Sequence, residues 1–112
     1  MATGELRWRA SQRLAGAAVQ QVLKEGRART VGTLRLQYRA NGLEHVRLAQ
    51  VIPKKLAARA VDRNRIRRVV REAFRLEQQR WAGYDCVVRL RSPWRKEDDH
   101  REAALRLVAG GP

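Results

Sequence analysis

The sequence predicts a small α+β protein in which helices cover one sheet. Three observations lead to this prediction: helical periodicity in residues 63–75, two-residue alternation that begins at Thr33, and a second alternating stretch that begins at Tyr84. Together with the flanking segments they give the order α-β-β-α-β-α, which is typical of an α/β sandwich. The 112 residues suffice for one core. We therefore expect a single domain over residues 1–112.

The N-terminal part predicts an irregular arm followed by a short helix. Residues 1–10 show no clear period. Ser11 can cap a helix that runs to about Lys24 and stops at Gly26. Residues 27–32 are basic and lie between two glycines, which indicates a connecting loop.

Two strands are predicted next. Leu34, Leu36 and Tyr38 alternate with polar residues, as expected of a half-buried strand. Asn41-Gly42 is a dipeptide that favours a tight hairpin turn, because both residues tolerate positive φ. The second strand is expected at residues 45–52, before the break at Pro53.

An arginine-rich helix is predicted to begin after an N-cap at Asp62 and to run to about Trp81, before Ala82-Gly83. Its apolar residues recur at spacings of three and four and form one stripe that predicts packing on a core. The stripe consists of Ile66, Val69, Val70, Ala73 and Phe74.

The C-terminal part predicts a strand and a helix. Residues 84–91 alternate, with Cys86, Val88 and Leu90 on one face. Asp98 or Asp99 can cap a last helix that extends through Val108. The buried side of that helix is expected to consist of Ala104, Leu105 and Val108. Residues 109–112 are expected to fray.

The charge of the chain predicts a polyanionic partner. The net charge is +14 and the isoelectric point is about 11.6, so the protein attracts polyanions over several ångströms. Nucleic acid is the first candidate and an anionic membrane the second. No run of eighteen apolar residues exists, so we expect no membrane insertion and a cytoplasmic protein. The single Cys86 excludes an internal disulfide.

The polar face of the arginine helix is the predicted binding surface. Asn64, Arg68, Arg71 and Arg75 lie opposite the apolar stripe, with Arg63 and Arg67 on one flank and Arg65 on the other. Cations spaced by four residues repel one another in the free protein. Guanidinium groups match phosphate geometry, so this pattern favours a phosphate-rich partner over a solvated cationic face, which stays as the alternative.

The side chains do not predict protein-based catalysis or a metal site. His45 and His100 are expected to be solvated, and Cys86 alternates with core residues. The acidic residues 97–99 favour a role at a helix N-terminus, where they complement the dipole. Binding of folded RNA through backbone charge fits better than base reading. A helix-turn-helix DNA reader is disfavoured by the strands on both sides of the arginine helix, so no DNA partner is expected.

The arginine helix resembles the RNR signature of the protein subunit of bacterial ribonuclease P. The matching residues are Arg63-Asn64-Arg65-Ile66-Arg67-Arg68, continued by Arg71-Glu72-Ala73-Phe74-Arg75. Lys54-Lys55 precedes this motif at a spacing known in that family, and Asp85-Cys86-Val87-Val88 follows it as the matching strand. The resemblance covers roughly residues 6 to 108 and is most specific between Arg47 and Arg75.

This resemblance implies a fold and a function. The fold would be an α-β sandwich in which the RNR helix forms a left-handed crossover between parallel strands, whereas spacing alone predicts the common right-handed crossover. The function would be that of a ribonucleoprotein endoribonuclease that removes the 5′ leader of precursor tRNA. Its catalytic centre, with the Mg2+ ions, would belong to the RNA partner.

The resemblance also implies the site residues. Contacts to the catalytic RNA would come from Arg63, Asn64, Arg65, Arg67, Arg68, Arg71, Lys54 and Lys55. A cleft between the first helix and the sheet would bind the leader through Val19, Leu23, Arg35 and Gln37. Many members have phenylalanine at the two helix positions. Aliphatic side chains cannot stack on a base, so leader binding here would depend more on backbone charge.

Two other functions stay open at this point. A structural protein of the ribosomal type could use the same basic helix to bind ribosomal RNA. An autonomous protein nuclease is disfavoured because no acid-base pair is present.

Overall fold

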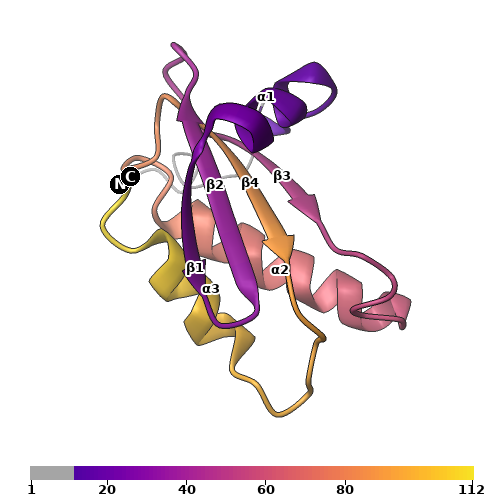
Figure 1. The fold of residues 1–112 in the computed structure, drawn as a ribbon. Coiled ribbons are helices and arrows are strands. Elements are labelled where there is room, and N and C mark those ends of the chain that lie inside the picture. Colours follow the sequence, from indigo (N-terminus) through magenta and orange to yellow (C-terminus); the bar gives the residue numbers. More distant parts are fainter. Residues whose placement is uncertain (1–11) are drawn as a thin grey trace.

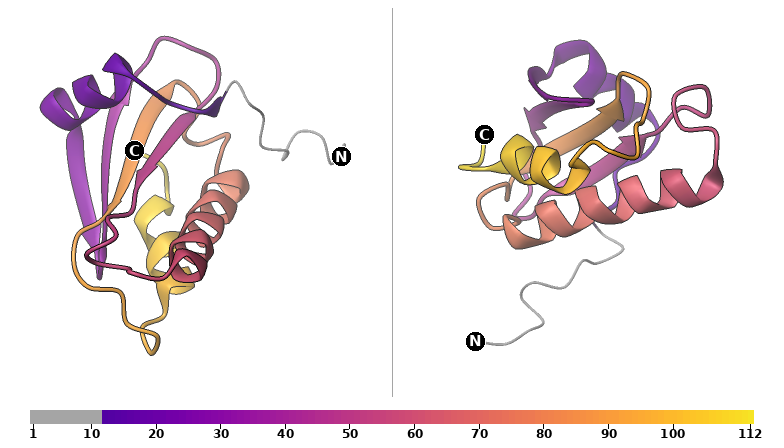
Figure 2. Two further views of the ribbon diagram at one scale, coloured as in Figure 1. Left: turned by 90° about the vertical axis from the view of Figure 1, so that its right-hand side faces the viewer. Right: turned by 90° about the horizontal axis from the view of Figure 1, so that it is seen from below.

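The computed structural model describes residues 12–112, and the predicted arm at 1–10 and the predicted cap Ser11 lie outside this range. The described elements are α1 (Ala17–Glu25), β1 (Arg27–Val31), β2 (Leu34–Ala40), β3 (Arg47–Val51), α2 (Ala60–Leu76), β4 (Tyr84–Leu90) and α3 (His100–Val108). The strands form one sheet in the order β1-β2-β4-β3 (Figure 1). Helix α1 lies on one face, and α2 and α3 cover the other (Figure 2). The predicted α+β sandwich is confirmed.

Strand β1 corrects the expected order, because residues 27–32 were predicted to be a connecting loop. β1 pairs antiparallel with β2, from Arg27 opposite Tyr38 to Val31 opposite Leu34. The two strands are joined by Gly32 and Thr33, and Gly32 has a φ of 57°. Glycine reaches this region without the steric cost of a Cβ, so it suits the two-residue turn.

Arg29 explains why a strand with so few apolar residues is stable. Its guanidinium lies 5.7 Å from the ring centroid of Tyr38 and 5.6 Å from that of Trp81. It also donates to the carbonyl oxygens of Leu107 and Gly111, each at 3.0 Å. Gly111 is buried. The tail that was expected to fray is therefore held at this residue.

The predicted hairpin at Asn41-Gly42 is wrong. Gly42 does have a positive φ of 71°, but β2 and β3 are not neighbours in the sheet, because β4 lies between them. β4 pairs antiparallel with β2 and parallel with β3. The dipeptide predicts a turn, and the pairing partner is decided by packing of the whole sheet.

Helix α2 connects the parallel strands β3 and β4 in a left-handed crossover. Both strands run downward in Figure 1, α2 lies behind the sheet, and β4 lies to the left of β3. A right-handed connection behind the sheet would place β4 to the right. The hand implied by the family resemblance is therefore confirmed, and the one expected from spacing alone is wrong.

The ends of α2 differ from the prediction. The helix begins one turn earlier, at Ala60, with Arg59 as N-cap, so Asp62 lies in the first turn. There its carboxylate complements the helix dipole. The helix ends at Leu76, and Trp81 lies in the following turns, where its indole nitrogen donates to the carbonyl oxygen of Val108 at 2.9 Å.

The observed ends of α1 and α3 can also be compared with the predicted ones. α1 begins after Gly16 and ends before Gly26, the predicted stop. Asp99 caps α3, as one of the two predicted alternatives, by accepting a hydrogen bond from the amide of Glu102.

The buried side of α3 differs from the one predicted. Leu105 is 36% exposed and Leu107 is buried in its place. His100 is 9% exposed, so the expectation of a solvated histidine is wrong.

The sheet separates two apolar clusters of unequal size. The larger cluster packs α2 and α3 against the sheet, and it includes the predicted helix residues Ile66, Val70, Ala73 and Phe74 together with Leu34, Leu36, Cys86, Val88 and Leu90. The smaller one lies under α1 and consists of Leu14, Val22 and Val87, with Ala18, Val19, Leu23 and Ala49 at its edge. Burial raises the pKa of the Cys86 thiol well above its usual value, as expected of a core cysteine.

Candidate nucleic-acid interface

The outward face of α2 is cationic because the opposite face is buried. Burial of the apolar stripe against the sheet fixes the rotation of the helix about its axis. As a result, Asn64, Arg65, Arg68 and Arg71 are exposed, and Arg67 is half-buried on the flank that faces β3. The backbone oxygen of Arg67 accepts a hydrogen bond from the Gln50 amide of β3 at 3.0 Å, which helps to hold the helix in place.

The arginines of this face have no acidic partner among the described residues. Within residues 12–112, the ion pairs are Arg39–Glu25, Arg47–Asp85, Arg75–Glu72 and Arg80–Glu77. Only Arg75 of α2 is paired, and its hydrogen bonds lower the pKa of Glu72. Arg65, Arg67, Arg68 and Arg71 therefore keep their full charge available to a ligand.

Arg63, which was predicted to contact RNA, also stabilises the loop before α2. Its Nη1 donates to the carbonyl oxygens of Ala57 and Ala58 at 2.9 and 2.8 Å. The guanidinium thus ties the segment before α2 to the first turn of the helix. Lys54 and Lys55 are exposed in the turn that opens this segment, beyond the end of β3.

Of the residues predicted to form a leader cleft, Val19, Leu23 and Gln37 come together at α1, and Arg35 lies two residues from Gln37 on the same face of β2. Arg35 is half-buried on the sheet, and Val19 and Leu23 are half-buried at the edge of the cluster under α1. Gln37 is only 7% exposed, and its amide donates to the carbonyl oxygen of Leu23 at 3.1 Å. Gln37 thus connects α1 to the sheet, and Arg35 is the member with a free charged group.

Arg89 is a functional candidate that the sequence analysis missed. It is exposed and lies directly opposite Arg35 in the β2–β4 ladder. Residues paired in this way point to the same face, and Arg89 shares the face of Val87, which is buried under α1. Alternation predicts that Arg89 lies on the face of its strand opposite Cys86, Val88 and Leu90, but its pairing with Arg35 follows only from the order of the strands in the sheet. Two like charges side by side repel, so this pair favours an anionic ligand.

Arg47 lies on the same face but is neutralised within the protein. Its Nε and Nη2 donate to the two carboxylate oxygens of Asp85, each at 2.7 Å. Asn41 donates to the same carboxylate at 2.9 Å. These hydrogen bonds raise the pKa of Arg47. This network fixes the β2–β3 connection against β4, and it leaves Arg35 and Arg89 as the available cations of the central strands.

Residues 12–112 contain neither a helix that could span a membrane nor a cluster that could hold a metal ion. No helix in this range is long and apolar enough to span a membrane. The same residues contain no group of three or more His, Cys, Asp or Glu side chains that could hold a metal ion.

The chain is similar in sequence to known proteins. The sequence matches the family Ribonuclease P over residues 10–106. It is 49% identical over 71 residues to the ribonuclease P protein component of Chromobacterium violaceum, a match that covers 63% of this chain and 58% of that protein. The corresponding protein of Nitrosococcus oceani is 45% identical over 69 residues, which cover 62% and 58% of the two chains. The match thus spans little more than half the length of these relatives.

The chain is also similar in fold to solved structures. The RNase P protein of Staphylococcus aureus superimposes with a TM-score of 0.75 at 25% identity, over 86% of this chain and 91% of that chain. The RNase P protein of Thermotoga maritima gives a TM-score of 0.68 at 30% identity, over 85% and 93%.

The Asp85 network predicts a stability difference between two matched variants. Asp85→Asn keeps the shape of the side chain but removes the charge that Arg47 needs, so we expect the free energy of unfolding to fall by about 1–3 kcal/mol. Glu25→Gln breaks the exposed pair with Arg39 and should cost less than about 1 kcal/mol. Urea denaturation of both variants measures the two losses. Equal losses would contradict a structural role for the Asp85 network.

Proposed function

Because the chain belongs to the Ribonuclease P family, we propose that it is the protein subunit of a ribonucleoprotein that removes the 5′ leader of precursor tRNA. The observation that supports this most directly is the outward face of α2, where Arg65, Arg68 and Arg71 are exposed without an acidic partner among the described residues. Its partner would be the RNA subunit. The compartment would be the cytoplasm, in keeping with a single thiol and no need for a disulfide.

In this proposal the protein binds and positions RNA. Phosphates of the RNA subunit lie along α2, where Arg67, Arg68 and Arg71 replace condensed counterions. Asn64 donates or accepts hydrogen bonds at the same surface, and Lys54 and Lys55 extend it beyond the N-terminus of the helix. Arg63 supports this surface from beneath through its bonds to the preceding loop.

The leader is proposed to bind on the other face of the sheet, beside α1. Arg35 and Arg89 supply adjacent positive charges, and Val19 and Leu23 form an apolar border. The aliphatic border cannot stack bases as an aromatic one would. Leader binding therefore depends on phosphate contacts and is expected to vary little with leader sequence.

Hydrolysis itself is assigned to the RNA. Mg2+ ions held by the RNA partner would stabilise the charge that develops on the phosphodiester oxygens. The role of this chain is to lower the electrostatic repulsion between the RNA subunit and the leader. Its cations thereby neutralise part of the phosphate charge that free Mg2+ would otherwise neutralise.

Reconstitution tests the function. Added to a bacterial ribonuclease P RNA at low Mg2+ concentration, the protein should increase the rate of leader cleavage from precursor tRNA, because its cations replace screening ions. Gel analysis of a 5′-labelled precursor measures the rate. A rate equal to that of RNA alone would refute the proposal. Co-purification with ribosomal subunits, with no effect on precursor tRNA, would instead favour a structural role on the ribosome.

A pair of variants tests the α2 surface. Arg68→Gln removes an outward cation of α2, so the slope of log affinity against log salt concentration should fall by about one. Arg106→Gln removes an exposed cation of α3 and serves as the matched control, with an unchanged slope. Filter binding of the RNA subunit between low and moderate salt gives both slopes. A similar fall in both variants would mean that binding depends on net charge and not on α2.

A second pair tests the leader surface. The double variant Arg35→Gln/Arg89→Gln should weaken binding of precursor tRNA by the assembled enzyme roughly tenfold, at about 1 kcal/mol or less for each exposed charge contact. Binding of mature tRNA, which has no leader, should be unchanged. The control is Arg27→Gln/Arg106→Gln, since Arg27 pairs with Tyr38 and shares the opposite face of the sheet. A loss for both tRNA forms would argue against a leader contact.

A further inference from the structure

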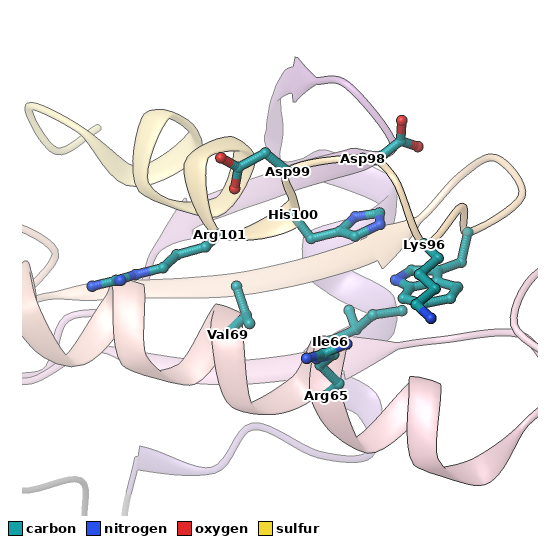
Figure 3. Close-up of a pocket in the computed structure, with 9 residues that line it drawn as sticks. Arg65, Ile66, Val69, Lys96, Asp98, Asp99, His100 and Arg101 are labelled. Carbon is teal, nitrogen blue, oxygen red and sulfur yellow. The ribbon is translucent and has the colours of Figure 1, made fainter.

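A pocket of about 320 Å³ lies between α2 and the loop that joins β4 to α3 (Figure 3). Ile66 and Val69 line it from α2, and Trp94 and His100 line it from the loop and the start of α3. Its charged residues are Arg65, Lys96, Asp98, Asp99 and Arg101. Only Arg65 has a role in the function proposed above.

The aromatic wall of the pocket is fixed from several directions. The rings of Trp94 and His100 stack at a centroid distance of 5.3 Å and an interplanar angle of 14°. The two nitrogens of the His100 ring lie within hydrogen-bond distance of the carbonyl oxygen of Arg95 and the hydroxyl of Thr33, at 3.0 and 3.3 Å. The backbone amide of Trp94 donates to Leu56 at 2.8 Å. These contacts hold the His100 ring and the Trp94 backbone in place, whereas the indole nitrogen of Trp94 has no hydrogen bond to the described residues.

Trp94 contributes a donor that the protein does not use. Its indole Nε1 is buried and has no hydrogen-bond partner among the described residues. An indole nitrogen can only donate, and buried donors are nearly always paired in folded proteins. By contrast, the other buried indole nitrogen, that of Trp81, is satisfied by Val108. Because the nitrogen is buried, an acceptor outside the protein reaches it only if the Trp94 ring shifts.

The charges around the pocket favour an anion on the side of α2. Figure 3 shows the carboxylates of Asp98 and Asp99 pointing away from Ile66 and Arg65. Asp99 is also bound to the N-terminus of α3 through the amide of Glu102. Arg65, Lys96 and Arg101 are exposed at the rim. A ligand with an apolar plane, a hydrogen-bond acceptor and a nearby phosphate combines all three features.

We propose that this pocket binds one unstacked nucleotide of the RNA that lies on α2. The base packs against Val69 and the ring of Trp94, and a small shift of this ring toward the pocket lets a carbonyl oxygen or ring nitrogen of the base accept from Trp94 Nε1. Phosphates on either side contact Arg65, Lys96 or Arg101. The volume is at the lower end of the range of about 300–1,000 Å³ for small-molecule pockets, which suits a single nucleotide.

The proposal rests on RNA binding by α2 and adds base recognition to it. Arg65 belongs to both surfaces, so a strand that follows α2 reaches the pocket without a break. Proteins that read RNA sequence typically do so through unstacked bases held by aromatic or apolar side chains. The α2 surface binds charge, and this pocket is where the complex would discriminate between bases.

Base-specific chemical probing of the RNA subunit, with saturating protein, tests the inference. With the wild-type protein, one base or a short run should be protected. With Trp94→Phe, which keeps an aromatic ring but lacks the donor, reactivity at that position should rise about fivefold. Lys96→Ala removes an exposed side chain that cannot affect folding much, and it should raise the same signal. Arg106→Gln is the control and should leave the protection unchanged.

The outcomes separate this inference from the proposed function. If the wild-type protein does not bind the RNA, the proposed function fails. If the RNA is bound and its protection is identical with Trp94→Phe, the pocket does not read a base and the inference fails. If Lys96→Ala has an effect and Trp94→Phe has none, the rim binds a phosphate only, which also overturns the inference. Circular dichroism of each variant confirms that it is folded.

Discussion

Burial of the apolar stripe of α2 against the sheet is the constraint on which the rest of the molecule depends. Ile66, Val70 and Phe74 are each at most 1% exposed, and together they contribute several kcal/mol on the usual scale for fully buried aliphatic and aromatic side chains. This burial leaves the helix one possible rotation about its axis. The arginines must then face outward, although their mutual repulsion costs free energy in the absence of RNA. Core packing thus presents the candidate binding surface.

The sheet topology places α2 against two neighbours, the sheet and α3. Since β3 and β4 are adjacent and parallel, α2 spans the sheet beneath them and ends beside α3. The loop before α3 is thereby brought against the first turns of α2, where Arg65 and Trp94 line one pocket. With the opposite hand of crossover, α2 would cover the other face of the sheet, where α1 now lies. The left-handed connection is therefore part of how the candidate site is built.

Much of the fold followed from periodicity, and the errors have physical causes. The stripe of α2 and the alternation in β2 and β4 are strong signals, because each buries one complete face. β1 was missed because Arg29 occupies a core-facing position, where its guanidinium is stabilised by Tyr38 and Trp81 in place of an apolar contact. The partner of β2 was wrong because Asn41-Gly42 specifies a local turn, whereas the pairing of β4 with β2 and β3 depends on contacts far apart in sequence. The pairing of Arg35 with Arg89 could not be predicted for the same reason, because it follows only from the order of the strands in the sheet.

Two separate cationic surfaces result from this arrangement, one on each side of the sheet. The molecule measures 35 × 35 × 24 Å, so a sheet and its helices lie between Arg68 and Arg35. At physiological ionic strength the Debye length is about 8 Å, and charges on the two faces are largely screened from each other. A polyanion bound along α2 would therefore leave the potential at Arg35 and Arg89 nearly intact. A protein of this size could in this way hold two negatively charged strands at once, one on each face, with the sheet and its helices between them.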